Sequence, residues 1–135
     1  LKGESIDIYN FGDMTRDWTH ISDIVQGIIK ALDHPAEPDP TWQGDTPKIE
    51  TSSAPFRVYQ LGRGKPVSLM EAVGQLEVAL GVTAEKNLMP MQLGDVKDTF
   101  AEIEAAQRDL DFAPSVDLAE GILDFVQWYK NYTEL

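Results

Sequence analysis

The chain has 135 residues, enough for one domain with a single core but too few for two full domains. Eleven basic against twenty-three acidic side chains give a net charge of −12, a field that repels nucleic acid and anionic lipid headgroups. The absence of cysteine excludes disulfides and thiolate sites, and two histidines are too few for a histidine-rich metal centre. No signal peptide or membrane-spanning run is present, so we expect a cytoplasmic chain that binds neither nucleic acid nor membrane.

The first predicted elements are short strands followed by a helix. Residues 6–9 alternate apolar and polar and end in a turn at 10–13, and residues 16–21 form a second extended stretch. From Ser22 onward the apolar period becomes helical, with Ser22 or Asp23 as the N-cap and His34-Pro35 as the stop. The stripe expected to be buried comprises Ile24, Val25, Ile28, Ile29 and Leu32.

Residues 35–55 are rich in proline and polar side chains, and Trp42 is their only large aromatic side chain before Phe56. This composition predicts a mobile surface loop. Loops of this length are uncommon within a domain and are either functional or disordered. Nothing in the segment could carry chemistry unaided, so we interpret it as a disordered segment or a plain insertion.

The second half of the chain predicts further strands and capped helices. A strand over 57–61 and a turn over 62–66 precede a helix that begins at Ser68, where Glu71 completes capping-box spacing, and that ends at Gly81. A strand over 83–88, a loop over 89–95 and a helix over 99–110 follow, and Asp117 opens the last helix. This order indicates a mixed α/β or α+β fold with about four helices.

Two enzyme signatures fail in this sequence. The turn Gly62-Arg63-Gly64 would need a third glycine where Val67 stands, and Pro66 removes an N–H donor that a dinucleotide loop would use. Tyr59 has arginine rather than lysine four residues later, and no Gly-x-Ser-x-Gly elbow is present. We therefore predict no catalytic residue, no cofactor site and no metal site within the chain.

Arg16 is the side chain with the clearest potential for ligand binding. It follows a glycine-containing turn in a strongly acidic chain, and a guanidinium there can bind a phosphate bidentately. The alternative is a surface salt bridge to an aspartate, and the residues alone leave both interpretations open.

Four blocks, taken in order, resemble the C-terminal part of nucleotide-sugar epimerases, which are extended short-chain dehydrogenases/reductases, and above all the UDP-glucuronate 4-epimerases. The blocks lie at 6–12, 16–25, 54–62 and 89–96 and read IDIYNFG, RDWTHISDIV, APFRVYQLG and MPMQLGDV. The resemblance covers nearly all of the chain. It implies that residues 1–135 are a substrate-binding segment, and that the N-terminal domain, which binds NAD and carries a catalytic Tyr-x-x-x-Lys, is absent here. The fragment alone is expected to be inactive.

The resemblance also implies roles for individual residues. Arg16 matches an arginine that meets the diphosphate of a UDP-sugar, and Asp95 matches an acidic residue near the ribose. Gln92 stands where related epimerases have a second phosphate-facing arginine and where UDP-glucuronate-type sequences often have glutamine. Tyr9 and Asn10 match the segment beside the uracil. UDP-glucuronate is the implied substrate, and NAD the implied cofactor of the full-length enzyme.

Other positions either have an expected structural role or depart from the family pattern. Asp17 and Asp23 are expected to be structural, Asp17 as a partner and Asp23 as a helix cap. Gln60, Arg63 and Glu102 replace the residues usual at their positions, which leaves the sugar specificity open.

The missing initiator methionine suggests a piece of a longer chain. The helix from Ser22 and the strand over 57–61 are expected to pack against the missing domain, so the isolated chain is expected to form a homo-oligomer. The alternative is a non-enzymatic interaction domain that keeps the fold. A glycine-rich turn followed by Tyr-x-x-x-Lys upstream of Leu1 would favour the enzyme.

Overall fold

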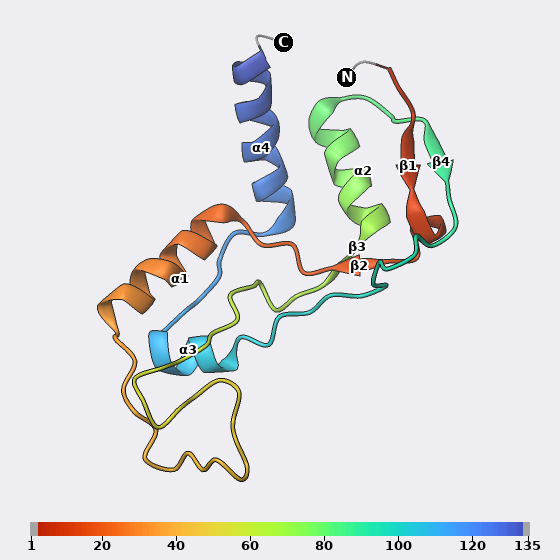
Figure 1. Cartoon of the computed structure of the whole chain (residues 1–135). Helices are drawn as coiled ribbons and strands as arrows, with labels where there is room; N and C mark the ends of the chain where they lie inside the picture. Colours follow the sequence, from red (N-terminus) through yellow and green to blue (C-terminus); the bar gives the residue numbers. More distant parts are fainter. Residues whose placement is uncertain (1–2, 134–135) are drawn as a thin grey trace.

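The computed structural model describes residues 3–133 and pairs strands that are distant in sequence (Figure 1). β1 (Ile6–Ile8) lies parallel to β4 (Lys86–Leu88). β2 (Thr15–Arg16) lies antiparallel to β3 (Val67–Ser68). These two-stranded sheets and four α-helices confirm the predicted mixed α/β fold, although the extended stretch predicted over 16–21 is a strand only at Arg16.

Helix α1 (Ile21–Asp33) begins at Ile21, with His20 as the N-cap rather than Ser22 or Asp23. The ring nitrogen Nδ1 of His20 accepts a hydrogen bond from the backbone N–H of Ser22 at 3.4 Å. The predicted buried stripe is largely open to solvent, since Ile28 and Ile29 are 50% and 53% exposed. Periodicity therefore predicted the helix correctly, but within residues 3–133 most of its apolar side is left uncovered.

Helix α2 (Leu69–Leu80) confirms its predicted start and end. The Ser68 hydroxyl accepts from the Glu71 backbone N–H at 3.1 Å, and Gly81 ends the helix in the left-handed region at φ 72°, where glycine is favoured. The Glu71 carboxylate accepts from Gln75 in the same helix instead of returning to Ser68 as a capping box requires. Only one half of the predicted box is formed.

Two predictions around α3 (Glu104–Leu110) are wrong. The helix begins at Glu104 rather than Thr99, because the preceding segment is hydrogen-bonded to Asp17. The backbone N–H of Asp17 donates to the Thr99 hydroxyl, and the backbone N–H of Ala101 donates to the Asp17 carboxylate. Residues 57–61 form no strand beyond an isolated bridge between Arg57 and Thr51. A strand needs a neighbour, and among the described residues this alternating segment pairs only through that bridge.

Helix α4 (Leu118–Thr133) begins where predicted, with Asp117 accepting from the Glu120 backbone N–H at 3.1 Å. It packs beside α2, and its Val126 is buried. Further along the helix, Trp128 stacks on Tyr132 with ring centroids 5.3 Å apart. Within residues 3–133, none of the helices has the length and apolar character to cross a bilayer.

The 35–55 segment is an irregular surface loop, as predicted, but it has internal order. The carboxylate of Asp39 accepts from the backbone N–H and hydroxyl of Thr41 and from the hydroxyl of Thr51, and Lys48 pairs with it at 3.2 Å. These hydrogen bonds, those from Thr41 foremost, hold the pKa of Asp39 well below its ordinary value. The loop is thus organised around one carboxylate.

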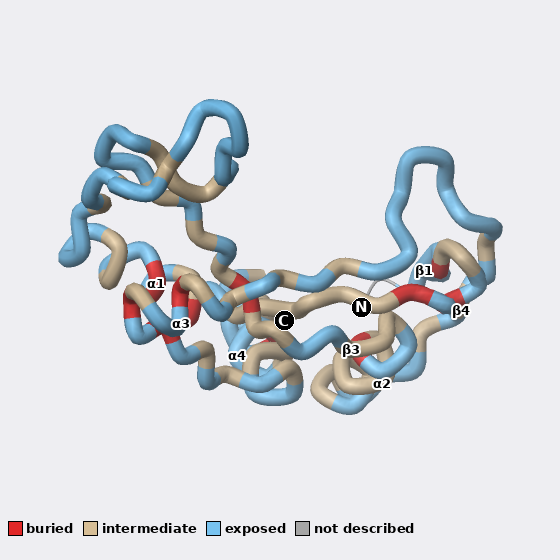
Figure 2. The backbone as a smooth tube through the Cα atoms, turned by 90° about the horizontal axis from the view of Figure 1, so that it is seen from below, coloured by how far each residue is buried: buried red, intermediate tan, exposed pale blue. Residues whose placement is uncertain are grey.

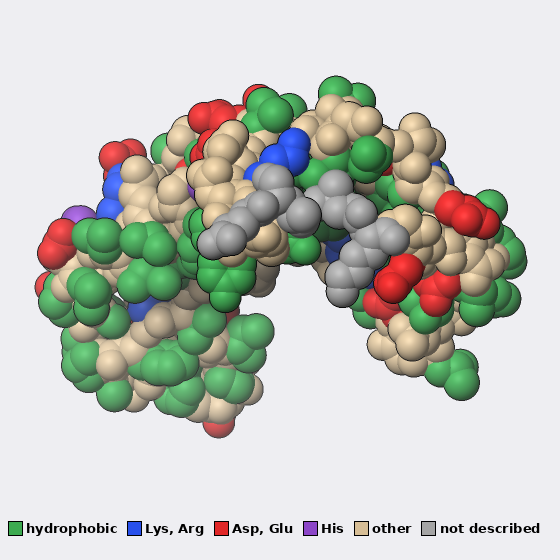
Figure 3. Space-filling model, turned by 90° about the horizontal axis from the view of Figure 1, so that it is seen from above, with side chains coloured by type: hydrophobic (Ala, Val, Ile, Leu, Met, Phe, Trp, Pro, Cys, Tyr) green, Lys and Arg blue, Asp and Glu red, His purple; other side chains and the backbone are tan. Residues whose placement is uncertain are grey.

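The buried core is small for the size of the chain (Figure 2). One cluster consists of Ala106, Leu110 and Phe112, packed against Leu61 and neighbouring side chains. The accessible surface is 9332 Å², whereas a compact folded protein of this mass exposes about 7,000 Å². Figure 3 shows the reason: the molecule is an arch with a hollow between two lobes, and hydrophobic side chains gather on the lobe at the end that holds α1 and α3.

Candidate substrate-binding site

The candidate site is built on two segments that run side by side, 8–16 and 88–99. Backbone hydrogen bonds join Met89 N–H to Ile8 O at 2.8 Å and Phe11 N–H to Met89 O at 3.0 Å. Further along, Thr15 N–H donates to Lys97 O at 3.1 Å. All five residues predicted to bind substrate therefore lie on two neighbouring stretches of chain, although they are up to 86 positions apart in sequence.

Arg16 is held in a defined orientation by its neighbours. Its Nη1 donates to the backbone carbonyls of Thr15 and Lys97 at 2.7 and 2.8 Å. Its Nη2 donates to Asp95 Oδ1 at 3.2 Å. With its side chain 25% exposed, the guanidinium is fixed at the molecular surface. Arg16 and Asp95, predicted separately, are in direct contact.

Asp95 is positioned by a tight turn. Its backbone N–H donates to the carbonyl of Gln92 at 3.2 Å, and Gly94 adopts φ 85°, a conformation that glycine takes at little cost. The carboxylate Oδ1 of Asp95 also accepts from the Val96 N–H at 2.9 Å. Gln92 is exposed on this turn, where the structure records its backbone carbonyl, rather than its side chain, in a hydrogen bond.

Tyr9 and Asn10 lie in the short 3₁₀ turn η1 (Tyr9–Gly12) that follows β1. Asn10 and Phe11 both adopt positive φ, 48° and 52°, and the Asn10 side chain donates to the Asp13 carbonyl at 2.6 Å. This bond stabilises a left-handed backbone that most side chains avoid. Neither Tyr9 nor Asn10 contacts Arg16 through any hydrogen bond found in residues 3–133, so the structure brings them to the same edge but not into one cluster.

A second cation, which the sequence analysis did not single out, lies at this edge. Lys97 Nζ pairs with Asp13 Oδ2 at 2.7 Å, and this hydrogen bond raises the pKa of Lys97. Each of the two cations at this edge is paired with a carboxylate, Arg16 with Asp95 and Lys97 with Asp13. The contacts of the Arg16 guanidinium with backbone carbonyls could not have been found from the residues, because carbonyl acceptors leave no trace in sequence.

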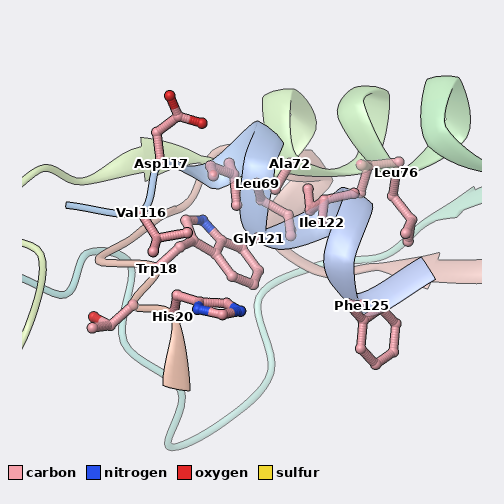
Figure 4. A pocket seen from close by; sticks show the side chains of 13 residues that line it. Trp18, His20, Leu69, Ala72, Leu76, Val116, Asp117, Gly121, Ile122 and Phe125 are labelled. Carbon is pink, nitrogen blue, oxygen red and sulfur yellow. The ribbon is translucent and has the colours of Figure 1, made fainter. Parts of the chain in front are cut away.

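A separate, largely apolar cavity lies elsewhere. A cavity of about 420 Å³ opens between α2 and α4 and is lined mostly by apolar side chains (Figure 4). Trp18 and His20 line it, but Arg16, Gln92 and Asp95 do not. The indole nitrogen of Trp18 is buried without a hydrogen-bond partner among the described residues. This cavity therefore belongs to the packing of the helices rather than to the charged edge.

Asp17 and Asp23 both have structural roles, as expected, but the role of Asp23 differs from the predicted helix cap. Asp17 accepts from the backbone N–H groups of Gly64 and Ala101 at 3.0 and 3.1 Å. Asp23 is buried and, instead of capping α1, accepts from the N–H groups of Ser115 and Val116. Each carboxylate fastens a distant segment of backbone. Within residues 3–133, no cluster of acidic or histidine side chains could hold a metal ion.

Comparison with known proteins finds similar sequences over nearly all of this chain. Residues 1–43 match the family model described as "NAD dependent epimerase/dehydratase family". The chain is 42% identical over 133 residues to a probable UDP-glucuronate 4-epimerase of Rhizobium meliloti, covering 96% of this chain and 39% of the relative. It is 43% identical over 136 residues to UDP-glucuronate 4-epimerase 4 of Arabidopsis thaliana, covering 98% of this chain and 30% of the relative.

The fold gives the same result. The solved structure of MoeE5 in complex with UDP-glucuronic acid and NAD matches with a TM-score of 0.76 at 26% identity, covering 98% of this chain and 38% of that chain. The chain is a relative of the nucleotide-sugar epimerases. The resemblance seen in the motifs of this epimerase relative is thereby confirmed. The chain spans 30–39% of the length of the two curated relatives named above.

Proposed function

We propose that this epimerase relative is the UDP-sugar-binding segment of an NAD-dependent nucleotide-sugar 4-epimerase, with UDP-glucuronate as the substrate. The observation that carries the proposal is the oriented guanidinium of Arg16, held by two backbone carbonyls at the edge that also presents Asp95 and Lys97. A fixed arginine in an acidic molecule is suited to a diphosphate, which it can bind with defined geometry.

The remaining roles in this proposal are those that the family resemblance implies. Arg16 binds the diphosphate, Asp95 accepts from the ribose hydroxyls, and Gln92 faces the phosphates from the same turn. Tyr9 and Asn10 run beside the uracil through their backbone groups. By binding and orienting the nucleotide, these residues supply the positional part of catalysis.

The glycine turn at 62–64 does not fit the phosphates of NAD. The turn Gly62-Arg63-Gly64 gives the N–H of Gly64 to the carboxylate of Asp17, and a side chain at Gly62 would collide with Ala101. The N–H of Gly64 is thus occupied in holding the turn to Asp17 and is not available to a phosphate. We place NAD binding and the hydride chemistry in a separate N-terminal domain, and the chain alone is inactive.

The exposed apolar side of α1 supports a partner on that surface. Val25, Ile28, Ile29 and Leu32 are each 45–74% exposed, and the surface area exceeds that of a compact protein as described above. We propose that the NAD-binding domain covers this side in the full-length enzyme. A non-enzymatic partner would use the same surface. In the isolated chain we expect self-association, so a monodisperse monomer by size-exclusion chromatography with light scattering would contradict this part.

Isothermal titration calorimetry with UDP-glucuronate at millimolar concentration tests the proposed function. We expect binding to the parent chain and its loss in Arg16→Ala. Arg108→Ala is the matched control, because Arg108 lies in α3 with its side chain 65% exposed and its removal changes the net charge by the same amount. Equal binding by the parent and Arg16→Ala, or no binding to either, would retire the proposal for this chain.

A further inference from the structure

Two adjoining cavities form one groove along α2. The cavity between α2 and α4 (Figure 4) measures about 420 Å³, and Leu69 and Leu76 are among the α2 residues that line it. A second cavity, of about 350 Å³, is lined by Leu76, by Leu80 and by residues 4–6, which lead into β1. Leu76 and Phe125 line both cavities. The groove therefore runs the length of α2 and ends beside the first described residues of the chain.

Residues 3–133 leave this groove unfilled. Phe125 in its wall is 53% exposed, although it belongs to a helix that packs on α2. Trp18 also lines the groove, and within the described residues its indole nitrogen is buried without a hydrogen-bond partner. Buried donors in folded proteins nearly always have an acceptor. An open apolar wall and an unpaired donor together indicate an occupant that has an apolar side and carries an oxygen acceptor.

The lining favours a helix as that occupant. Because the walls are mostly apolar, a backbone that enters the groove has to satisfy its own N–H and C=O groups, as a helix does within a single segment. Helix α2 has 12 residues, and at 1.5 Å per residue it is about 18 Å long. A helix of about 12 residues therefore matches the groove in length.

The position and charge of the groove favour polypeptide attached at residues 4–6 over a second copy of the chain. A segment joined to the chain at one end of the groove is present there at a high effective concentration. A second copy would instead bring another net charge of −12 toward Glu4 and Asp117, which line the groove, and like charges oppose such an approach.

We propose that the groove is the docking surface for the polypeptide that directly precedes Leu1 in the full-length protein, folded as an amphipathic helix of about 12 residues. This inference rests on the proposed function, because it assumes that the chain continues upstream of Leu1. It adds a division of the two apolar surfaces. The upstream helix completes the core between α2 and α4, whereas the NAD-binding domain covers α1.

Hydrogen exchange tests the proposal on two chains, residues 1–135 and a chain that begins about 20 residues earlier in the same reading frame, which is long enough to include such a helix. We expect the protection of the α2 amides to rise about tenfold or more in the longer chain, because burial of one large apolar side chain is sufficient for that factor. The NMR resonance of the Trp18 indole N–H should shift as well. Unchanged protection of α2, or an unmoved Trp18 resonance, would overturn the proposal.

Val73→Asp and Val78→Asp are matched variants on α2. Val73 lines the groove, whereas Val78 is 83% exposed and lines neither of its two cavities. In the longer chain, we expect Val73→Asp to remove the gain in protection and Val78→Asp to retain it. Equal effects of the two variants would place the upstream helix elsewhere. If Val73→Asp does not fold, the comparison of the two unsubstituted chains still decides the question.

Two further measurements separate this proposal from its alternatives. If light scattering showed a dimer of residues 1–135 that Val73→Asp abolished and Val78→Asp did not, the groove would belong to a second copy and the proposal would be wrong. Calorimetry with UDP-glucuronate reports on the proposed function independently, because neither Arg16 nor Asp95 lines the groove. Loss of the proposed function would appear as absent nucleotide binding, and failure of the docking proposal as unchanged exchange in α2.

Discussion

The carboxylate of Asp23 in α1 accepts a hydrogen bond from the backbone N–H of Val116, 93 positions later, at 3.2 Å. The same carboxylate accepts from the N–H of Ser115 at 3.1 Å. Asp23 is only 4% exposed. A single buried side chain thus holds the segment that leads into α4 against the helix that follows the Arg16 strand.

Replacing Asp23 with alanine leaves both backbone N–H groups without their charged acceptor. Hydrogen bonds to charged groups contribute about 1.5–3 kcal/mol each, so we expect the free energy of unfolding to fall by about 3 kcal/mol. Urea unfolding measures the change. Asp33→Ala, at the exposed end of the same helix, is the control and should shift stability by less than about 0.5 kcal/mol. Equal effects of the two substitutions would contradict this role of Asp23.

The contrast between Asp23 and Ser68 shows which features were predictable from sequence. Ser68 caps the helix that begins at its own position, a contact within one turn that residue order alone predicts. Asp23 was expected to act in the same local way. It instead binds backbone far along the chain, because a carboxylate near a helix start can satisfy any N–H that the fold brings to it.

The same distinction explains the strands and the site. β1 and β4 were both predicted as strands, and they pair with each other. Residues 57–61 have the alternation of a strand, but they do not pair with another predicted strand. Arg16 was singled out from the residues and Asp95 from the family resemblance, and their contact came from the alignment of two segments that no local pattern encodes. Lys97 was missed for the same reason.

Gly27 and Gly74 make a matched pair of helical glycines with opposite predicted outcomes. A side chain at Gly27 in α1 would lie 2.8 Å from Leu61 and 3.2 Å from the buried ring of Phe112, so overpacking should outweigh the gain in helix propensity. We expect Gly27→Ala to lower the free energy of unfolding by about 1–2 kcal/mol. Gly74 in α2 has open space around it, so Gly74→Ala should raise that free energy by about 1 kcal/mol.

Thermal unfolding of the two glycine variants beside the parent chain gives the comparison. Because both substitutions add one methyl group to a helix interior, a difference in sign isolates the close approach at Gly27. Stabilisation by Gly27→Ala would mean that Leu61 moves aside freely and that the packing of α1 against this segment is loose. Destabilisation by Gly74→Ala would indicate that α2 needs flexibility at that position.

Acidification should weaken the 35–55 loop, but only below the range in which free aspartate titrates. Thr41, Thr51 and Lys48 hydrogen-bond to Asp39 and lower its pKa from the ordinary value of 3.8. A depressed pKa means that the unfolded loop binds the proton more readily than the folded loop. The stabilisation is therefore present above the ordinary pKa and is lost as the pH falls toward the lower, folded-state value.

The backbone amide of Thr41, which donates to Asp39 Oδ1 at 2.8 Å, reports this titration by NMR. We expect its chemical shift to stay constant as the pH is lowered to the ordinary pKa of 3.8 and to change only below that point. Asp39→Asn serves as the control, because it removes the titrating group and should abolish the transition. A midpoint at or above 3.8 in the parent chain would show that the loop does not stabilise the Asp39 carboxylate, and that its order has another source.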